Sequence, residues 1–358
     1  MNVILNRLEM LRKKMKLKNT DAVLINKRVN YMYMSGFTGT SACLFITESR
    51  AVLLTDFRYT DQASMQSPEY EIVKHTGGHI SELNDLIETE KVERLSFEEG
   101  HLTYAEHGEY LRKLKVSEFL PLGGVIEELR RTKDESEIGR IKKAVEIADS
   151  AFTHILGFIK PGVAEIELAA EIEYFMKRHG ASGPSFETIV ASGLRSSMPH
   201  GVASEKKLEA GDVVTLDYGA LCNGYCSDIT RTVFLGKPDR ELERIYGIVL
   251  DAQLKGLECV RSGWAGKDVD AVSRAVIADA GYGENFGHGL GHGVGLDIHE
   301  EPTLSMRGTV ELKDGMVVTV EPGIYKNGLG GVRIEDMVVV SGEVPRILTE
   351  ATKEMIIL

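Results

Sequence analysis

The chain has 358 residues, enough for two domains of ordinary size. Acidic residues outnumber basic ones by 54 to 42, a formal net charge of −12, which makes the chain a poor general partner for nucleic-acid backbones or anionic lipid. No apolar run approaches the roughly 20 residues of a membrane span, and the apolar N-terminal run is too short for a signal peptide. Four irregularly spaced cysteines fit a reducing compartment. We therefore expect a cytoplasmic protein that binds neither nucleic acid nor membrane.

Residues 1–122 alternate between helical and strand-like patterns. An amphipathic helix is predicted over 7–17, a buried strand over 22–25 and a hairpin formed by 42–46 and 51–54. Two further helices are predicted over 80–87 and 104–114, and a strand is predicted over 95–97. The sequence therefore predicts a small mixed α/β domain. Its first helix carries a basic cluster, which we interpret as a solvated helix face because the surrounding chain is acidic: Arg12, Lys13, Lys14, Lys16 and Lys18.

The segment Pro121–Gly124 marks the predicted boundary of a second domain, residues 123–358. Thr132 or Asp134 can cap a helix that runs to about residue 159, with a glutamate three residues later completing a capping box. A second helix is predicted over 166–178 and ends before a glycine. Beyond residue 185 the chain becomes strand-rich and unusually rich in glycine.

A hairpin is predicted around Asn223-Gly224, a pair typical of a two-residue turn. Symmetric pairing about this turn places Gly219 opposite Asp228. Asp217 lies on the same face as Gly219, so the two aspartates are diagonal neighbours with Cα atoms about 7–8 Å apart. Carboxylates that converge within an apolar strand pair repel each other, so one keeps a proton or a cation binds between them. Two exposed hairpin aspartates are the alternative interpretation.

Cys222 and Cys226 are candidate zinc ligands by residue type. The same hairpin register places them on opposite faces of the strand pair. We therefore interpret both as packing residues.

Three histidines, His288, His292 and His299, lie within twelve residues and alternate with glycines. This density of glycine argues against a helix and allows the backbone to approach a ligand closely. A core histidine explains one of the three, so we expect one or two to bind a metal and the others to hydrogen-bond the reacting group. His200, on a loop before a strand, is a fourth candidate.

Glu321 and Glu335 each end or interrupt an apolar strand pattern. Glu335 is expected to be buried and to need a partner. A salt bridge to Arg333 is one interpretation, but both side chains would then point into a site. Two aspartates, two glutamates and one histidine form an oxygen-rich set whose charge of −4 matches two divalent ions, with Mn²⁺ favoured and Co²⁺, Fe²⁺ or Zn²⁺ possible. Two such ions can share a water and present hydroxide to a carbonyl.

The motifs that contain these residues are LDYG, SDITRT, HGLGHGVGLDIHE, EPGIY and GVRIED. In this order they resemble the pita-bread metallopeptidases, and among them the branch of Xaa-Pro aminopeptidases and prolidases. YMYMSGF at 31–37 and TDFRY at 55–59 are similar to the creatinase-type leading domain of that branch. The resemblance implies an α+β pita-bread catalytic domain over 123–358, preceded by a smaller creatinase-type α/β domain over 1–122. It also implies a homodimer and a proline-containing peptide as substrate.

The resemblance assigns a role to each candidate ligand. Asp217 binds one metal, Asp228 and Glu335 bridge both metals, and His292 and Glu321 complete the second site. Glu321 also handles the proton of the nucleophilic water. The remaining candidates hold substrate, stabilise the tetrahedral oxyanion or surround the ligands: His200, His288, His299, Tyr325 and Arg333.

One position departs from the pattern of the family. Prolidases of this type usually carry an arginine four residues after the histidine equivalent to His299, where this chain has Thr303. Losing a bidentate carboxylate clamp weakens the selection of dipeptides. We therefore expect an Xaa-Pro aminopeptidase, with a dipeptide-specific Xaa-Pro dipeptidase as the alternative. A creatinase with a metal-free site and a non-catalytic peptide-binding module are more remote, because all five ligand positions are intact.

Overall fold

The computed structural model describes residues 2–358, and the chain forms two compact units, Met1–Arg130 and Arg131–Leu358. The boundary at residues 122–123 stays a prediction; it lies just before helix α6 (Val125–Arg131). Within the described range, none of the helices combines the length and the apolar character that crossing a membrane requires.

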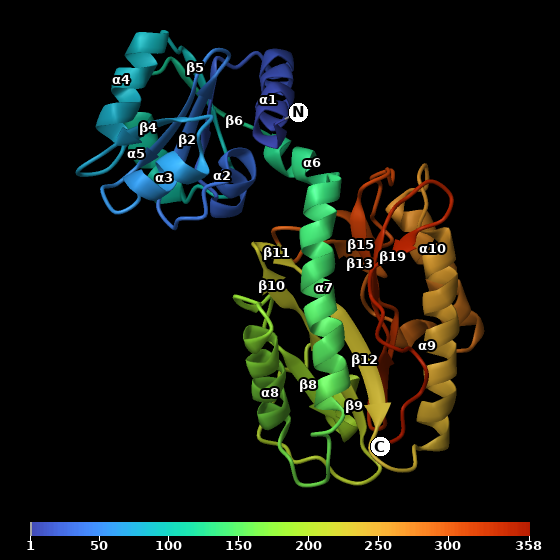
Figure 1. The fold of residues 1–358 in the computed structure, drawn as a ribbon. Coiled ribbons are helices and arrows are strands. Elements are labelled where there is room, and N and C mark those ends of the chain that lie inside the picture. Colours follow the sequence, from blue (N-terminus) through green and yellow to red (C-terminus); the bar gives the residue numbers. More distant parts are fainter. Residues whose placement is uncertain (1) are drawn as a thin grey trace. The chain divides into compact units, whose positions relative to one another are not determined.

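The first unit is built on a six-stranded mixed sheet in the order β4-β3-β2-β1-β5-β6 (Figure 1). β1 pairs with β2 antiparallel and with β5 parallel. The strands are β1 (Ala22–Ile25), β2 (Cys43–Thr47), β3 (Ala51–Thr55), β4 (Glu71–Lys74), β5 (Arg94–Phe97) and β6 (Glu118–Pro121). The helices before α6 are α1 (Val3–Lys18), α2 (Arg28–Ser35), α3 (Thr60–Gln66), α4 (Ile80–Glu90) and α5 (Tyr104–Lys113). The expected α/β architecture is confirmed.

The basic cluster of α1 lies among acidic partners. Lys13 pairs with Glu9 at 2.7 Å, and Lys14 pairs with Glu128 at 2.6 Å. Residues 30–35 belong to α2, whose Tyr31 and Met34 are buried in the core of the unit.

The second unit contains two pairs of long helices. The predicted capping box forms at Asp134 and Glu137 and starts α7 (Glu135–Ile155), which packs against α8 (Glu165–Arg178). The second pair, α9 (Arg240–Cys259) and α10 (Gly266–Asp279), falls in the part of the chain expected to be strand-rich. Asp239 caps α9, and its buried residues Leu242, Ile245 and Val249 follow the spacing of an amphipathic helix.

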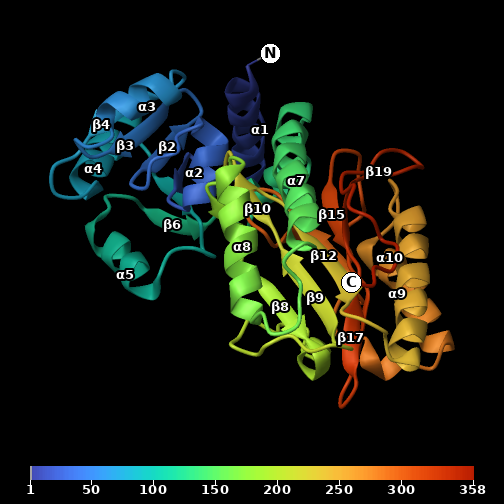
Figure 2. The same ribbon diagram turned by 60° about the horizontal axis from the view of Figure 1, so that its bottom comes forward.

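Each helix pair covers one half of the strands of this unit (Figures 1 and 2). α7 and α8 share a core with the antiparallel strands β8, β9 and β12. α9 and α10 share a second core with strands that follow α10 in the chain, drawn in orange and red in Figure 1. The strands of the first half are β7 (Gly183–Pro184), β8 (Ile189–Ser192), β9 (Val213–Tyr218), β10 (Ala220–Cys222), β11 (Tyr225–Cys226) and β12 (Ile229–Phe234). The others are β13 (Gly291–Gly293), β14 (Glu300–Leu304), β15 (Val317–Val320), β16 (Gly323–Lys326), β17 (Gly330–Arg333), β18 (Asp336–Val339) and β19 (Arg346–Ile347). Short 3-10 helices cover Gly193–Ser197 and Gly283–Asn285.

The hairpin at Asn223-Gly224 has the predicted register. Cys222 pairs with Tyr225 across the turn, and both turn residues have positive φ, 51° and 83°. Such φ values match the twist of a tight hairpin. The register continues unbroken into β9 and β12, where Asp217 pairs with Thr230.

Two glycines of this unit allow neighbouring backbone segments to pack closely. A Cβ atom on Gly219 would overlap the carbonyl oxygen of Ser227, and one on Gly291 would overlap that of Thr319. The close approach of neighbouring backbones therefore requires these glycines. Gly289 and Gly291 also line the cleft of the second unit, so the expectation that the backbone there can approach a ligand stays a prediction.

Candidate metal centre and active site

The four acidic candidates lie where strands of the second unit break or change sheet. Asp217 is near the end of β9, just before the interruption at residue 219. Asp228 lies between β11 and β12, Glu321 between β15 and β16, and Glu335 between β17 and β18. At such junctions a side chain can leave the regular alternation of a sheet. The fold thereby brings together carboxylates that are more than a hundred residues apart in sequence.

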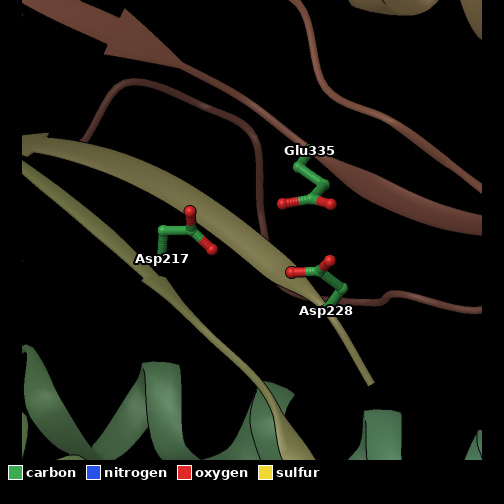
Figure 3. A group of neighbouring side chains, drawn as sticks. All are labelled: Asp217, Asp228 and Glu335. Atoms are coloured by element: carbon green, nitrogen blue, oxygen red, sulfur yellow. The ribbon is translucent and has the colours of Figure 1, made fainter. Parts of the chain in front are cut away.

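Three of these carboxylates face one another across a small gap (Figure 3). Asp217, Asp228 and Glu335 each offer an oxygen, and these oxygens all lie within 4.8 Å of one another. His292 Nε2 lies 3.5 Å from Asp228 Oδ2 and 3.3 Å from Glu321 Oε1, which joins the remaining two candidates to the group. The structure thus gathers all five predicted ligand positions in one place.

The five residues fit divalent metal ions in their donor types, and two of their carboxylate oxygens lack a partner. Asp217 Oδ1 and Glu335 Oε1 are buried and have no hydrogen-bond partner among residues 2–358. An unpaired buried carboxylate oxygen is costly, and a cation in the gap would satisfy it. Carboxylate oxygens and one imidazole form a hard ligand set without thiolate. The two cysteines once considered for zinc are buried elsewhere, Cys222 near Gly180 and Cys226 near Leu296.

His292 is oriented by its neighbours for binding through Nε2. Its Nδ1 lies 3.1 Å from the carbonyl oxygen of Gly293, and its backbone N–H donates to Thr319 Oγ1. A proton held on Nδ1 by that carbonyl leaves the Nε2 lone pair pointing at the carboxylates. Thr319 Oγ1 also donates to Glu321 at 3.2 Å. Thr319 therefore positions one predicted ligand on each side.

The pKa values of the carboxylates in the gap reflect their burial and their mutual repulsion. Burial, together with the charges of Glu335 and Asp217, raises the pKa of Asp228 well above its usual value. Burial and neighbouring acidic charges likewise raise the pKa of Glu335. Burial also acts to raise the pKa of Glu321, but the hydrogen bond and charge of His292 outweigh it and lower that pKa to about 2. Bound cations would hold all four carboxylates ionised.

A network of donors surrounds this gap. Arg333 Nη2 donates to Asp217 Oδ2 at 2.5 Å, so Arg333 pairs with Asp217 rather than with Glu335. Arg333 also donates to Tyr325 Oη at 2.7 Å. Thr230 Oγ1 donates to Glu335 Oε2 at 2.7 Å and receives a hydrogen bond from Arg333. Arg333 and Glu335 both line the site, as expected, although the salt bridge between them does not form.

The sequence analysis did not identify two threonines, Thr230 and Thr319, that position these ligands. Thr230 on β12 lies two residues after Asp228, and Thr319 on β15 lies two residues before Glu321, each ligand adjoining the end of the strand. The alternation of a strand places such residues on one face, so that spacing was the available signal.

The gap forms the floor of a cleft of about 520 Å³. Nine of the predicted site residues line it: His200, Asp217, Asp228, His288, His292, His299, Glu321, Arg333 and Glu335. Tyr325 lies behind this surface, where its hydroxyl contacts His288 Nε2 at 2.9 Å. Thr303, at the position of the missing arginine, also lines the cleft.

The three histidines outside the ligand set differ in what their rings contact. Both ring nitrogens of His288 are engaged, Nδ1 with the Gly289 carbonyl at 2.8 Å and Nε2 with Tyr325. In the described part of the chain, the rings of His200 and His299 form no hydrogen bond, and the His299 ring packs edge-on against His292 with centroids 4.5 Å apart. His200 and His299 therefore keep donors available for a bound molecule.

Comparisons with known proteins agree with this architecture. Residues 139–342 match metallopeptidase family M24, and residues 7–132 match the creatinase/prolidase N-terminal domain. The Xaa-Pro dipeptidase of Pyrococcus furiosus is 41% identical over 356 residues, covering 98% of this chain and 99% of that protein. A solved Xaa-Pro dipeptidase from Bacillus anthracis has a TM-score of 0.98 and 48% identity, covering 99% and 100% of the two chains. The X-Pro aminopeptidase from Thermotoga maritima MSB8 has a TM-score of 0.91 and 39% identity, covering 97% and 100%.

The family match covers more than half of the chain, and these relatives match nearly all of it. The expected creatinase-type leading domain and pita-bread catalytic domain are confirmed, as is the resemblance to the branch of prolidases and Xaa-Pro aminopeptidases. Divalent metal ions are the cofactors of a metallopeptidase with this donor set. The chain is an enzyme that cleaves peptides and belongs to metallopeptidase family M24.

Proposed function

We propose that this chain is an Xaa-Pro dipeptidase, which hydrolyses the bond between a residue and a following C-terminal proline. The observation that carries the proposal is full-length similarity to two proteins of that name, at 41% and 48% identity. The sequence alone favoured an Xaa-Pro aminopeptidase, with the dipeptidase as the alternative. The comparisons support the dipeptidase better.

Five residues would hold two divalent ions: Asp217, Asp228, His292, Glu321 and Glu335. The convergence of three carboxylates and the unpaired oxygens of Asp217 and Glu335 support this assignment. Asp228 and Glu335 would serve both ions, since each lies within the group and faces the other across the gap. When bound, the ions supply a water of lowered pKa and polarise the carbonyl of the scissile bond. Mn²⁺ suits this ligand set best.

The side chains of the cleft then orient the substrate and move the proton. Glu321 accepts the proton of the attacking water, held in place by Thr319 and His292. His200 and His299 donate to the oxygen that becomes negative, because their ring nitrogens are not engaged by the protein. Tyr325 and Arg333 act one layer further out: Arg333 holds Asp217, and Tyr325 holds His288.

A second candidate, an Xaa-Pro aminopeptidase that accepts longer peptides, is favoured by Thr303. This residue lines the cleft where related prolidases usually place an arginine. A threonine cannot form the two parallel hydrogen bonds that an arginine offers to a carboxylate. The resemblance of the fold to the Thermotoga aminopeptidase supports the same candidate.

Kinetics on two substrates separate these functions. The purified enzyme with added Mn²⁺ is assayed on leucyl-proline and on leucyl-prolyl-glycine. A higher kcat/KM for the dipeptide supports the dipeptidase, and a higher value for the tripeptide contradicts it in favour of the aminopeptidase. Thr303→Arg provides the matched control, since a restored clamp should shift the ratio further toward the dipeptide.

The compartment and the assembly belong to the same proposal. The four cysteines are all free in the described structure, which supports a reducing, cytoplasmic location. A homodimer rests on resemblance alone and stays a prediction, which the molar mass in solution would test.

A further inference from the structure

One charged side chain of the cleft has no part in the network described above. Glu187 is exposed and lines the cleft, and its carboxylate forms no hydrogen bond or ion pair with any described residue. The other charged side chains of the lining are engaged, as in the pair of Arg333 and Asp217 and the contact of His292 with Glu321. Glu187 is therefore a negative charge at the cleft that neither the protein nor the proposed ions neutralise.

The backbone that carries Glu187 is anchored on both sides to the strands of the metal centre. Before it, Ser185 donates from its backbone to Gly219 and from its hydroxyl to Ser227, at 2.9 and 2.7 Å. After it, Ile189 pairs directly with Asp217. The intervening segment is only three residues long, so the position of Glu187 relative to Asp217 and the neighbouring Asp228 is fixed by the sheet.

The wall around Glu187 is apolar. Phe186, Ile189 and Val202 line the same cleft, and Ile189 is 7% exposed. An apolar wall that ends at an exposed carboxylate matches the side chain of lysine or arginine, in which an aliphatic stem carries a charged head. An aliphatic or aromatic side chain would contact the wall but leave the carboxylate unpaired.

The α-ammonium group of a substrate is a less suitable partner for this carboxylate. It is two bonds from the scissile carbonyl carbon and therefore stays near the buried carboxylates of the floor. Glu187 is exposed, whereas Asp228 and Glu335 on the floor are 5% and 1% exposed. The charged head of a lysine or arginine side chain extends further from the scissile bond than the α-ammonium group does, which suits an exposed carboxylate.

From this arrangement we infer that Glu187 is a specificity residue that selects lysine or arginine before the proline. The inference rests on the proposed function, because it concerns the residue on the N-terminal side of the cleaved bond. It narrows the substrate class to Xaa-Pro peptides with a cationic first residue.

The test compares lysyl-proline with norleucyl-proline, which has the same stem without the charged head. The wild-type enzyme should show a kcat/KM about fivefold higher for lysyl-proline, the scale of one solvent-exposed ion pair. Glu187→Gln should make kcat/KM for the two dipeptides equal. Glu187→Lys should make glutamyl-proline a better substrate than lysyl-proline. The ratio should also fall as salt is added, because salt screens an exposed pair.

Glu243→Gln is the matched control, since it removes an exposed glutamate of the same unit on α9 and outside the cleft. It should keep the wild-type ratio. Equal kcat/KM for the two dipeptides, or a preference that survives Glu187→Gln, overturns the inference while leaving the proposed function intact. If Glu187→Gln instead lowers both values equally, Glu187 binds the α-ammonium group and the inference is wrong. If neither dipeptide is cut, the proposed function itself fails.

Discussion

Two buried clusters of charged side chains are built from residues close together in the sequence of the second unit. Asp228 and Glu335 face the cleft, whereas the adjoining chain directs Arg231 and Asp336 to the other side. Arg231 Nη2 lies 2.9 Å from Asp336 Oδ1, and both side chains are 1% exposed. Residues close together in sequence thus contribute to two clusters that are similarly buried but differ in whether their charges are paired.

The cluster around Asp336 is internally complete. Besides Arg231, Asp336 Oδ2 accepts hydrogen bonds from Gln253 at 2.9 Å and Lys353 at 2.6 Å. Arg231 also donates to the carbonyl oxygens of Ala351 and Thr352, which ties the C-terminal segment to the sheet. Every charge there has a partner from the protein.

The cluster around Asp228 is incomplete by the same criterion. Asp217 Oδ1 and Glu335 Oε1 are buried without a partner. Burial of acidic groups is therefore not the feature that separates the two clusters; the difference lies in whether the protein supplies the opposite charge. A complete cluster stabilises the fold, and an incomplete one binds something from outside.

The largest effect should come from removing a ligand that serves both ions. Asp228→Ala and Glu335→Ala should each abolish hydrolysis and lower metal content, because each carboxylate is proposed to contact both ions. Metal analysis and a peptidase assay on the same preparation check this. Retained activity in either variant would refute the bridging assignment. Asp251→Ala, at an exposed pair with Lys255, is the control and should change neither quantity.

A substitution in the cluster around Asp336 should lower the stability of the protein and leave its metal content unchanged. Asp336→Ala leaves Arg231 buried without its carboxylate, which should lower the free energy of unfolding by about 3–5 kcal/mol. Urea denaturation of the metal-loaded protein measures this change. A loss no larger than that of Asp251→Ala would show that the buried pair contributes little to stability.

A smaller effect is expected for a group that touches substrate but not metal. His299→Ala should lower kcat by about a hundredfold, the scale of one donor to an oxyanion, with metal content unchanged. Its ring packs against His292 without bonding to the carboxylates. If this variant lost its metal, His299 would be a ligand and the division of roles would be wrong.

The smallest effect concerns the metal-free protein and its pH dependence. Burial and acidic neighbours raise the pKa of Asp228, so its folded-state pKa exceeds the unfolded value. Such a group favours the folded state at low pH, and this contribution is lost as pH rises through the folded pKa. The Tm of the metal-free protein should therefore fall as pH rises above the usual pKa of an aspartate, about 4.

Replacing the Asp228 carboxylate by a neutral amide should remove part of the dependence of Tm on pH. Asp228→Asn should raise the Tm of the metal-free protein near neutral pH by about 2–4 °C while abolishing activity. Differential scanning calorimetry in chelator measures both the shift and its pH profile. An unchanged profile would mean that repulsion within the gap does not destabilise the empty site.

Much of this molecule could be predicted from local patterns. The turn at Asn223-Gly224 fixes the register of its hairpin, because both residues adopt positive φ readily, and that register alone places Asp217 beside Asp228. The capping box at Asp134 likewise fixes the start of α7. These features depend on residues close in sequence, whose geometry the backbone dictates.

The partners of the charged groups could not be predicted in this way. Arg333 is two residues from Glu335, yet it pairs with Asp217, 116 positions away, because β17 and β9 pack together. The engagement of His288 Nε2 depends on Tyr325, 37 positions away, in the same manner. Such contacts arise only once distant strands meet.

Residue types and the motifs around them were sufficient to identify the candidate metal ligands, because they carry that chemistry. Only the packing of distant strands shows which of the ligand oxygens stay unpaired, which histidine rings form no hydrogen bond and where Glu187 lies. The physical reason is that charge compensation depends on distance in space, and strand packing sets those distances between residues that the chain keeps far apart.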